Sequence, residues 1–171
     1  MIITQTPFRM SFFGGGTDIE DYFKENGGAV LSTTFDKYCY VNVRHLPRFF
    51  EYSTELVYSK TERVTRIDDI QHPAIKNAMK MLDMHELRLT YDADLPARSG
   101  LGTSSSFAVG MLNAFYALKG KYASKRQLAD EAVYLEISSI ISSSSSFSQY
   151  VLLKLLYTLF IKSFPSLSVS I

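Results

Sequence analysis

The sequence predicts a mixed α and β protein built around one domain of substantial size. Segments rich in β-branched and aromatic residues predict strands, and longer segments with apolar residues at helical spacing predict helices. The chain has 171 residues, of which 46% are hydrophobic and 20% are charged, a balance typical of a globular protein. The net charge is +1 and the Lys and Arg residues are scattered, which argues against the concentrated basic face of a nucleic-acid-binding protein.

The first half of the chain is expected to consist mainly of strands. Their β-branched and aromatic residues place them at residues 2–13, 29–35, 38–46 and 55–59. The segment "GGGTD" at residues 14–18 ends the first strand. Residues 19–26 fit a short helix, which Gly27 and Gly28 would end in the manner of a C-cap.

The second half of the chain alternates helices with one strand. Pro73 suits the first position of a helix over residues 73–84, because that position needs no N–H group. Alternating apolar residues predict a strand at 87–94. An apolar face of Phe107, Met111, Leu112, Phe115 and Leu118 predicts a helix at 103–119, which Gly120 ends. Ser124 and Gln127 form a capping box for a last helix that reaches about Glu136.

The segment "PARSGLGTSSS" at residues 96–106 joins the last predicted strand to the next helix. The first N–H groups of a helix have no acceptor within it, and the helix dipole adds partial positive charge there. Glycines allow close approach of a ligand, and the hydroxyls of residues 103–106 can bind phosphate oxygens or a metal. A Walker A loop would need Lys at Thr103, and a dinucleotide fingerprint would need Gly at Ser105. From these residues alone, an ordinary turn with Ser and Thr caps remains the alternative.

This segment resembles the central phosphate-binding motif of the GHMP kinases, P-x-x-x-G-L-G-S-S, with Thr103 in place of the first Ser. A second segment, "TPFRMSFFGGGTD" at residues 6–18, resembles the N-terminal motif of the same family. With Gly27-Gly28 and Asp36-Lys37-Tyr38, it is similar to the bacterial heptose-7-phosphate kinase branch. The resemblance covers about residues 1–136. It implies an α+β fold like domain 2 of ribosomal protein S5, with a mixed sheet and helices on one side.

The resemblance also implies a site for ATP and Mg²⁺. The triphosphate would be held by Pro96, Ser99, Gly100, Leu101, Gly102, Thr103, Ser104 and Ser105. Ser104 and Glu136 would hold Mg²⁺, which usually keeps several waters and takes one or two protein oxygens. The acceptor sugar would contact Gly15, Gly16, Thr17 and Asp18. Arg9 would be catalytic by stabilising charge on the transferred phosphoryl group.

Three of these residues also have a simpler explanation. Glu136 could be a solvated helix carboxylate, Asp18 could cap the following helix, and Arg9 could be a surface residue on an alternating strand. The histidines match no metal-ligand spacing and are expected to be structural or surface residues: His45, His72 and His85. Cys39 is the only cysteine, so no intrachain disulfide can form, and it is expected to be a small strand residue.

The composition changes sharply near residue 137. Residues 138–171 contain two charged residues, both lysines, and twelve serines. The family usually has a Gln-Asp segment here, whose Asp is the proposed base for the acceptor hydroxyl, but Gln149 is followed by Tyr150. We therefore divide the chain into an N-terminal ATP-binding domain at 1–137 and an atypical tail at 138–171, with the second domain of the family missing.

Three explanations remain open for the tail. It could be a frameshifted reading that truncates the protein, which we favour, or a segment that packs on the domain or a partner. A membrane segment fits least well, because the apolar piece Leu155–Ile161 is far shorter than the roughly 20 residues needed to span a bilayer.

The function that the resemblance implies is that of an ATP-dependent sugar kinase acting on the anomeric hydroxyl of heptose 7-phosphate. This chain is expected to be a truncated form with weak or no activity. Three alternatives remain: a catalytically dead nucleotide-binding or regulatory module, a kinase for another sugar such as fucose or galactose, and a structural S5-like domain without a ligand. The expected partners are ATP and a sugar phosphate, without nucleic acid or membrane, and a homo-oligomer is left open. No secretory signal is present at the N-terminus, so a cytoplasmic location is expected.

Overall fold

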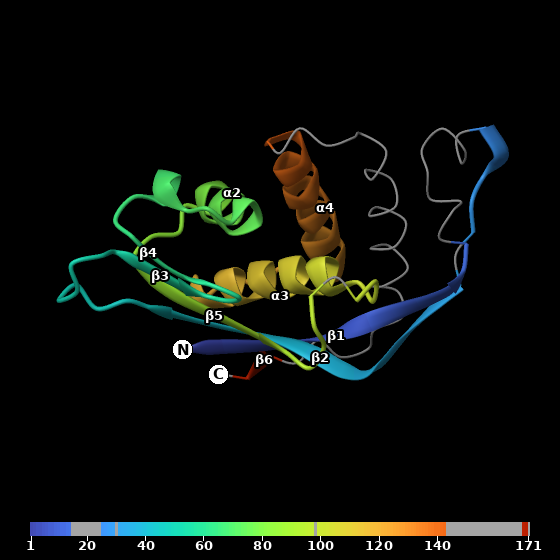
Figure 1. The fold of residues 1–171 in the computed structure, drawn as a ribbon, viewed down its shortest axis with the longest axis horizontal. Coiled ribbons are helices and arrows are strands. Elements are labelled where there is room, and N and C mark those ends of the chain that lie inside the picture. Colours follow the sequence, from blue (N-terminus) through green and yellow to red (C-terminus); the bar gives the residue numbers. More distant parts are fainter. Residues whose placement is uncertain (15–24, 30, 98, 143–168, 171) are drawn as a thin grey trace.

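The computed structural model describes residues 1–14, 25–29, 31–97, 99–142 and 169–170 (Figure 1). Within them lies a six-stranded sheet with the order β4-β3-β5-β2-β1-β6. The strands are β1 (Ile2–Phe13), β2 (Leu31–His45), β3 (Thr54–Val57), β4 (Thr61–Val64), β5 (Leu87–Ala93) and β6 (Val169–Ser170). The helices are η2 (Ile67–Asp69, a 3₁₀ turn), α2 (Pro73–Met81), α3 (Thr103–Leu118) and α4 (Lys125–Ser142).

The sheet is mixed, and the helices cover one of its faces. Strand β3 runs parallel to β5, whereas the other neighbouring strands are antiparallel. Figure 1 shows α2, α3 and α4 on the same side of the sheet, with α3 lying along it. The structure therefore confirms the predicted α+β fold with a mixed sheet and helices on one side.

Strand β2 corrects one prediction. Residues 29–35 and 38–46 were expected to form two strands, but Leu31–His45 form one continuous strand. The pairing with β1 shifts register inside it, from Pro7 opposite Tyr38 to Arg9 opposite Thr34. The polar residues Asp36 and Lys37 lie within this irregularity and do not end the strand. A bulge can leave extra residues unpaired while the ladder continues on either side.

Several element ends also differ from the prediction. Strand β3 ends at Val57 and α2 ends at Met81, where Leu82 serves as the C-cap. The sequence patterns missed β4 and the 3₁₀ turn, which are too short to show a clear period. The predicted start of α4 is supported by the Gln127 N–H, which donates to Oγ of Ser124 at 3.2 Å. The helix continues past residue 136 to Ser142.

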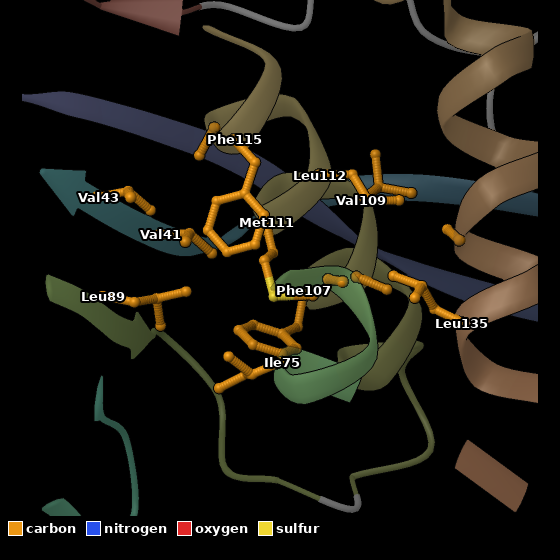
Figure 2. Packing of buried hydrophobic residues seen from close by; sticks show 14 of the residues in the cluster. Val41, Val43, Ile75, Leu89, Phe107, Val109, Met111, Leu112, Phe115 and Leu135 are labelled. Carbon is orange, nitrogen blue, oxygen red and sulfur yellow. The ribbon is translucent and has the colours of Figure 1, made fainter. Parts of the chain in front are cut away.

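Helix α3 forms the centre of the hydrophobic core (Figure 2). It buries more than its predicted apolar face, because it packs against both the sheet and α4. Around it lie inward-facing residues of the sheet, such as Val41, Val43 and Leu89, together with Ile75 of α2 and Leu135 of α4. A helix enclosed on several sides is expected to be apolar around its whole circumference.

Gly110 allows α3 to approach β1 closely. A Cβ atom at this position would lie 2.7 Å from Oγ1 of Thr6. The hydroxyl of Thr4 donates to the carbonyl of Gly110 at 2.8 Å, so the helix and the strand are joined by a buried hydrogen bond. This contact fixes the position of α3 relative to the strand that carries Arg9.

The predicted tail is described only in part. Residues 138–142 continue α4, and Val169 and Ser170 pair with Thr4 and Ile3 at the outer edge of β1. The division of the chain at residue 137 stays a prediction. Among the described helices, none combines the length and the apolar character needed to cross a membrane.

Candidate functional site

The loop between β5 and α3 begins at a fixed point on the sheet. The N–H of Asp94 donates to the carbonyl of Tyr38 at 3.0 Å, and Oδ2 of Asp94 accepts from the N–H of Tyr38 at 2.8 Å. This reciprocal pair extends the pairing of β5 with β2 beyond the end of the strand. The chain then leaves the sheet at residue 95 and turns toward the start of α3.

Two glycines give the loop its shape. Gly100 has φ of 75° and Gly102 has φ of 73°, both in the left-handed region that side chains disfavour. Gly102 is the N-cap of α3 and offers no capping side chain. The first hydrogen bond of the helix runs from Ser106 N–H to the carbonyl of Gly102 at 3.0 Å. The preceding N–H groups lie at a helix start, where the helix supplies no acceptors and the dipole favours an anion.

Arg9 lies directly against this loop. Its backbone N–H donates to the carbonyl of Leu101 at 3.1 Å, which ties β1 to the loop. A Cβ atom on Gly102 would lie 3.4 Å from Nη2 of Arg9, so the guanidinium faces the left-handed glycine. Nη1 of Arg9 donates to Oγ of Ser11 at 2.5 Å, which holds the side chain along the strand. Arg9 therefore lies beside the loop rather than at an isolated position on the sheet surface, and its catalytic role stays a prediction.

The run of hydroxyl residues at 103–106 divides into two parts. Ser104 is exposed, and Thr103 and Ser105 are half-buried at the start of α3. Ser106 is only 1% exposed, and its hydroxyl donates to the carbonyl of Pro7 at 2.9 Å. The expectation that all four hydroxyls could bind phosphate or metal is therefore wrong for Ser106. Its hydroxyl instead joins α3 to β1 beside Arg9.

The structure describes the other predicted site residues only in part. Pro96 and Ser99 are exposed in the loop before α3. The backbone of Glu136 lies on α4, and its side chain is outside the described part of the structure. The sugar-binding residues predicted between β1 and β2 also lie outside the described residues: Gly15, Gly16, Thr17 and Asp18. The described residues contain no group of three or more His, Cys, Asp or Glu side chains that could hold a metal.

An aromatic cluster next to α3 was not predicted. His72 packs edge-on against Tyr58, with ring centroids 5.1 Å apart, and lies 5.6 Å from the ring of Phe107. Phe107 in turn contacts Tyr91 at 4.9 Å. The cluster joins the residue after β3, the N-cap of α2, strand β5 and helix α3 at the level of the first turns of α3. The one sequence signal related to this cluster was Pro73. It marks the start of α2 and thereby places His72 at the N-cap position of that helix.

Burial shifts the pKa values of two residues in this cluster, His72 and Tyr58. Burial lowers the pKa of His72, partly opposed by the charge of Glu62. The neutral ring accepts from the N–H of Ile75 through Nδ1 at 3.5 Å, so its role is structural. Burial and a hydrogen bond to Glu62 raise the pKa of Tyr58 to about 12. His85 pairs with Asp83 at the surface, and His45 ends β2 in an exposed position.

Comparison with known proteins identifies the kind of domain that carries this loop. Residues 70–153 match the family described as the GHMP kinases N terminal domain. Over 126 residues, the chain is 30% identical to the D-glycero-alpha-D-manno-heptose 7-phosphate kinase of Campylobacter jejuni, which covers 67% of this chain and 37% of that protein.

Solved structures share the fold at lower identity. A D-glycero-D-manno-heptose 1-phosphate kinase from Bacteroides thetaiotaomicron has a TM-score of 0.69 at 23% identity, covering 88% of this chain and 52% of its own. The mevalonate kinase of Methanococcus jannaschii has a TM-score of 0.64 at 18% identity, covering 88% of this chain and 50% of its own. The chain thus spans about half the length of these structures and 37% of the curated relative.

Proposed function

The chain contains the N-terminal domain of the GHMP kinases, and we propose that it binds ATP at residues 99–105 as part of an ATP-dependent sugar kinase. The observation that carries this proposal is the arrangement of two left-handed glycines at the start of α3 with Arg9 against the second of them. A helix N-terminus next to a guanidinium is suited to a polyphosphate, because both favour negative charge.

The proposed contacts follow from the geometry of the loop. The backbone at Gly100 and Gly102 presents no side chain, so phosphate oxygens can approach the first N–H groups of α3. The hydroxyls of Thr103, Ser104 and Ser105 would add hydrogen bonds at the same end of the helix. Arg9 would stabilise the negative charge of the transferred phosphoryl group, which is the main demand of phosphoryl transfer.

The donor set also fits Mg²⁺. Ser104 is exposed at the start of α3, and Glu136 lies on α4, the helix that packs against α3. One hydroxyl and one carboxylate suit an ion that takes few protein oxygens and binds phosphate oxygens as well. When bound, Mg²⁺ would neutralise charge on the phosphates, and Ser104 and Glu136 are the residues proposed to hold it.

For the acceptor we propose a heptose 7-phosphate, phosphorylated at its anomeric hydroxyl. The support is the name of the Campylobacter jejuni relative, with which this chain shares 30% identity over 126 residues. In this proposal Gly15, Gly16, Thr17 and Asp18 bind the sugar, since a carboxylate can accept two hydroxyl hydrogen bonds. We also propose a cytoplasmic location, where ATP and sugar phosphates are available.

A coupled assay of ADP release tests the kinase proposal. The chain is incubated with Mg-ATP and heptose 7-phosphate, and galactose and fucose serve as alternative acceptors. We expect little turnover from this chain, because residues 137–171 contain no Asp or Glu that could accept the proton of the acceptor hydroxyl. Sustained turnover that Arg9→Ala reduces would show activity and contradict the expected weakness of this chain. Turnover with galactose but not heptose 7-phosphate would contradict the proposed acceptor.

The lack of Asp and Glu in residues 137–171 also supports a second candidate, a nucleotide-binding module without catalysis. This candidate predicts saturable binding of a non-hydrolysable ATP analogue, measured by calorimetry, with no phosphorylated sugar under any condition. Gly102→Arg would weaken the binding by placing a long side chain at a left-handed position in the loop. No detectable binding to the wild-type chain would contradict both candidates.

A further inference from the structure

A row of charged side chains crosses the sheet on the face opposite the helices. The strand registers place Arg63, Glu55, Arg88 and Arg44 side by side on β4, β3, β5 and β2. Their neighbours along the strands, such as Leu89 and Val43, are fully buried in the core. Because side chains alternate between the two faces of a sheet, the charged row lies on the open face.

The single acidic residue of this row is already engaged on both oxygens. Oε1 of Glu55 lies 2.9 Å from Nε of Arg63, and Oε2 lies 2.8 Å from Nε of Arg88. The second contact is an ion pair without a hydrogen bond, since Nε of Arg88 has no hydrogen-bond partner among the described residues. One carboxylate therefore serves two arginines.

Arg44 adds a third positive charge to the row. It is paired in register with Arg88, and it forms no ion pair with any described residue. Like charges directly opposite each other on neighbouring strands destabilise a sheet, so this pair calls for a compensating anion. Glu55 compensates Arg88, but no acidic residue of the described chain forms an ion pair with Arg44. Glu86 pairs with Arg48, and Asp92 lies four positions along β5 from Arg88, opposite Tyr40.

The two arginines line a hollow of about 310 Å³. Its other lining residues are Met1, Asn42 and Thr90. Asn42 and Thr90 are paired in register and contribute neutral hydrogen-bond donors beside the two guanidinium groups. The hollow thus combines positive charge with polar donors, and no acidic residue is among the residues that line it.

We propose that this hollow binds a phosphate group, either as inorganic phosphate or as a phosphate monoester. The guanidinium fork matches the oxygens of phosphate, and an anion between Arg44 and Arg88 would supply the counter-charge that Arg44 does not have among the described residues. The hollow is confined to one place on the sheet, which suits a small anion better than a nucleic acid. The site is separate from the loop before α3, because that loop leads into the helix layer on the other face. It does not depend on the proposed kinase function.

Nuclear magnetic resonance of the ¹⁵N-labelled full chain can test this site directly. Inorganic phosphate and glycerol 3-phosphate are titrated in separate experiments at constant ionic strength. The signals to follow are Nε–Hε of Arg44 and Arg88 and the side-chain amide of Asn42. We expect saturable shifts at these groups, and the tighter of the two ligands identifies the form that is bound. Because the readout is specific for the hollow, phosphate bound at the loop before α3 does not interfere.

Matched variants separate binding at the hollow from a general effect of charge. Arg44→Gln is expected to raise the dissociation constant about tenfold or more, because it removes a charged hydrogen-bond donor. Arg126→Gln removes the same charge from α4, where the side chain is 92% exposed, and should leave binding unchanged. If Arg44→Gln disturbs the fold, Arg44→Lys keeps the charge, removes the fork and should still weaken binding. The proposal is overturned if no signal of the hollow saturates with either ligand, or if the Arg44 and Arg126 variants bind equally well.

Discussion

Replacing Gly102 by Ala tests whether the loop binds ATP through its left-handed glycine and Arg9. The new Cβ would lie 3.4 Å from Nη2 of Arg9, an ordinary contact distance, so the substitution introduces no severe clash. Its stability effect should come from φ of 73°, which costs an alanine about 1–2 kcal/mol. The lower entropy of the unfolded chain offsets about 0.4–1 kcal/mol. The net loss should be about 1 kcal/mol, or roughly 2–4 °C in melting temperature.

Gly120→Ala is the matched control for this substitution. Gly120 has φ of 67°, and a Cβ there would meet nothing within 4 Å. The two variants should therefore lose similar stability in thermal or urea unfolding. Only Gly102→Ala should weaken the binding of Mg-ATP, because its methyl group lies between Arg9 and the start of α3. The expected loss in affinity is about tenfold or more, equivalent to one charge-assisted hydrogen bond.

Calorimetric titration of both variants with a non-hydrolysable ATP analogue decides the outcome. The reasoning is refuted if Gly102→Ala binds as tightly as the wild-type chain. It is also refuted if Gly120→Ala loses the same affinity, since the effect would then come from stability alone.

Three further predictions concern the core and its titrating groups. Gly110→Ala should lower the free energy of unfolding by about 1 kcal/mol, because crowding against Oγ1 of Thr6 outweighs the better helix propensity, and adding Thr6→Ala should restore it. Burial raises the pKa of Cys39 to about 12, so a thiol reagent at pH 8 should modify it only in urea. Because this pKa exceeds the unfolded value, the contribution of Cys39 to stability should be constant below pH 9 and fall from pH 9 to 12. Burial lowers the pKa of His72, so stability should fall as the pH drops below 6.5, and His72→Asn should reduce this loss in urea melts at pH 7.5 and 5.5.

The sequence predicted the loop before α3 well, because its signals are local. Gly100 and Gly102 sit where the backbone needs positive φ, and the apolar spacing after Thr103 is that of a helix. The strand that carries Arg9 was also predicted over the same residues that the structure gives to β1. Neighbouring residues alone contain the information for these features.

Features that depend on distant contacts could not be predicted in the same way. Ser106 looks identical to its neighbours in the sequence, but its burial depends on Pro7, 99 residues earlier in the chain. The aromatic cluster of His72 and Phe107 forms only when α2 and α3 pack on the sheet. The continuity of β2 through Asp36 depends on its pairing with β1 rather than on its own polar residues.

The central claim is that the start of α3 and Arg9 together hold the phosphates of ATP. The most direct measurement is a titration of the ¹⁵N-labelled full chain with a non-hydrolysable ATP analogue and Mg²⁺, followed by backbone amide shifts. We expect the largest shifts at residues 100–105 and at Nε–Hε of Arg9, with small shifts at the end of α3 near Gly120. Saturable shifts elsewhere with none at residues 100–105, or no saturable shifts at all, would contradict the account.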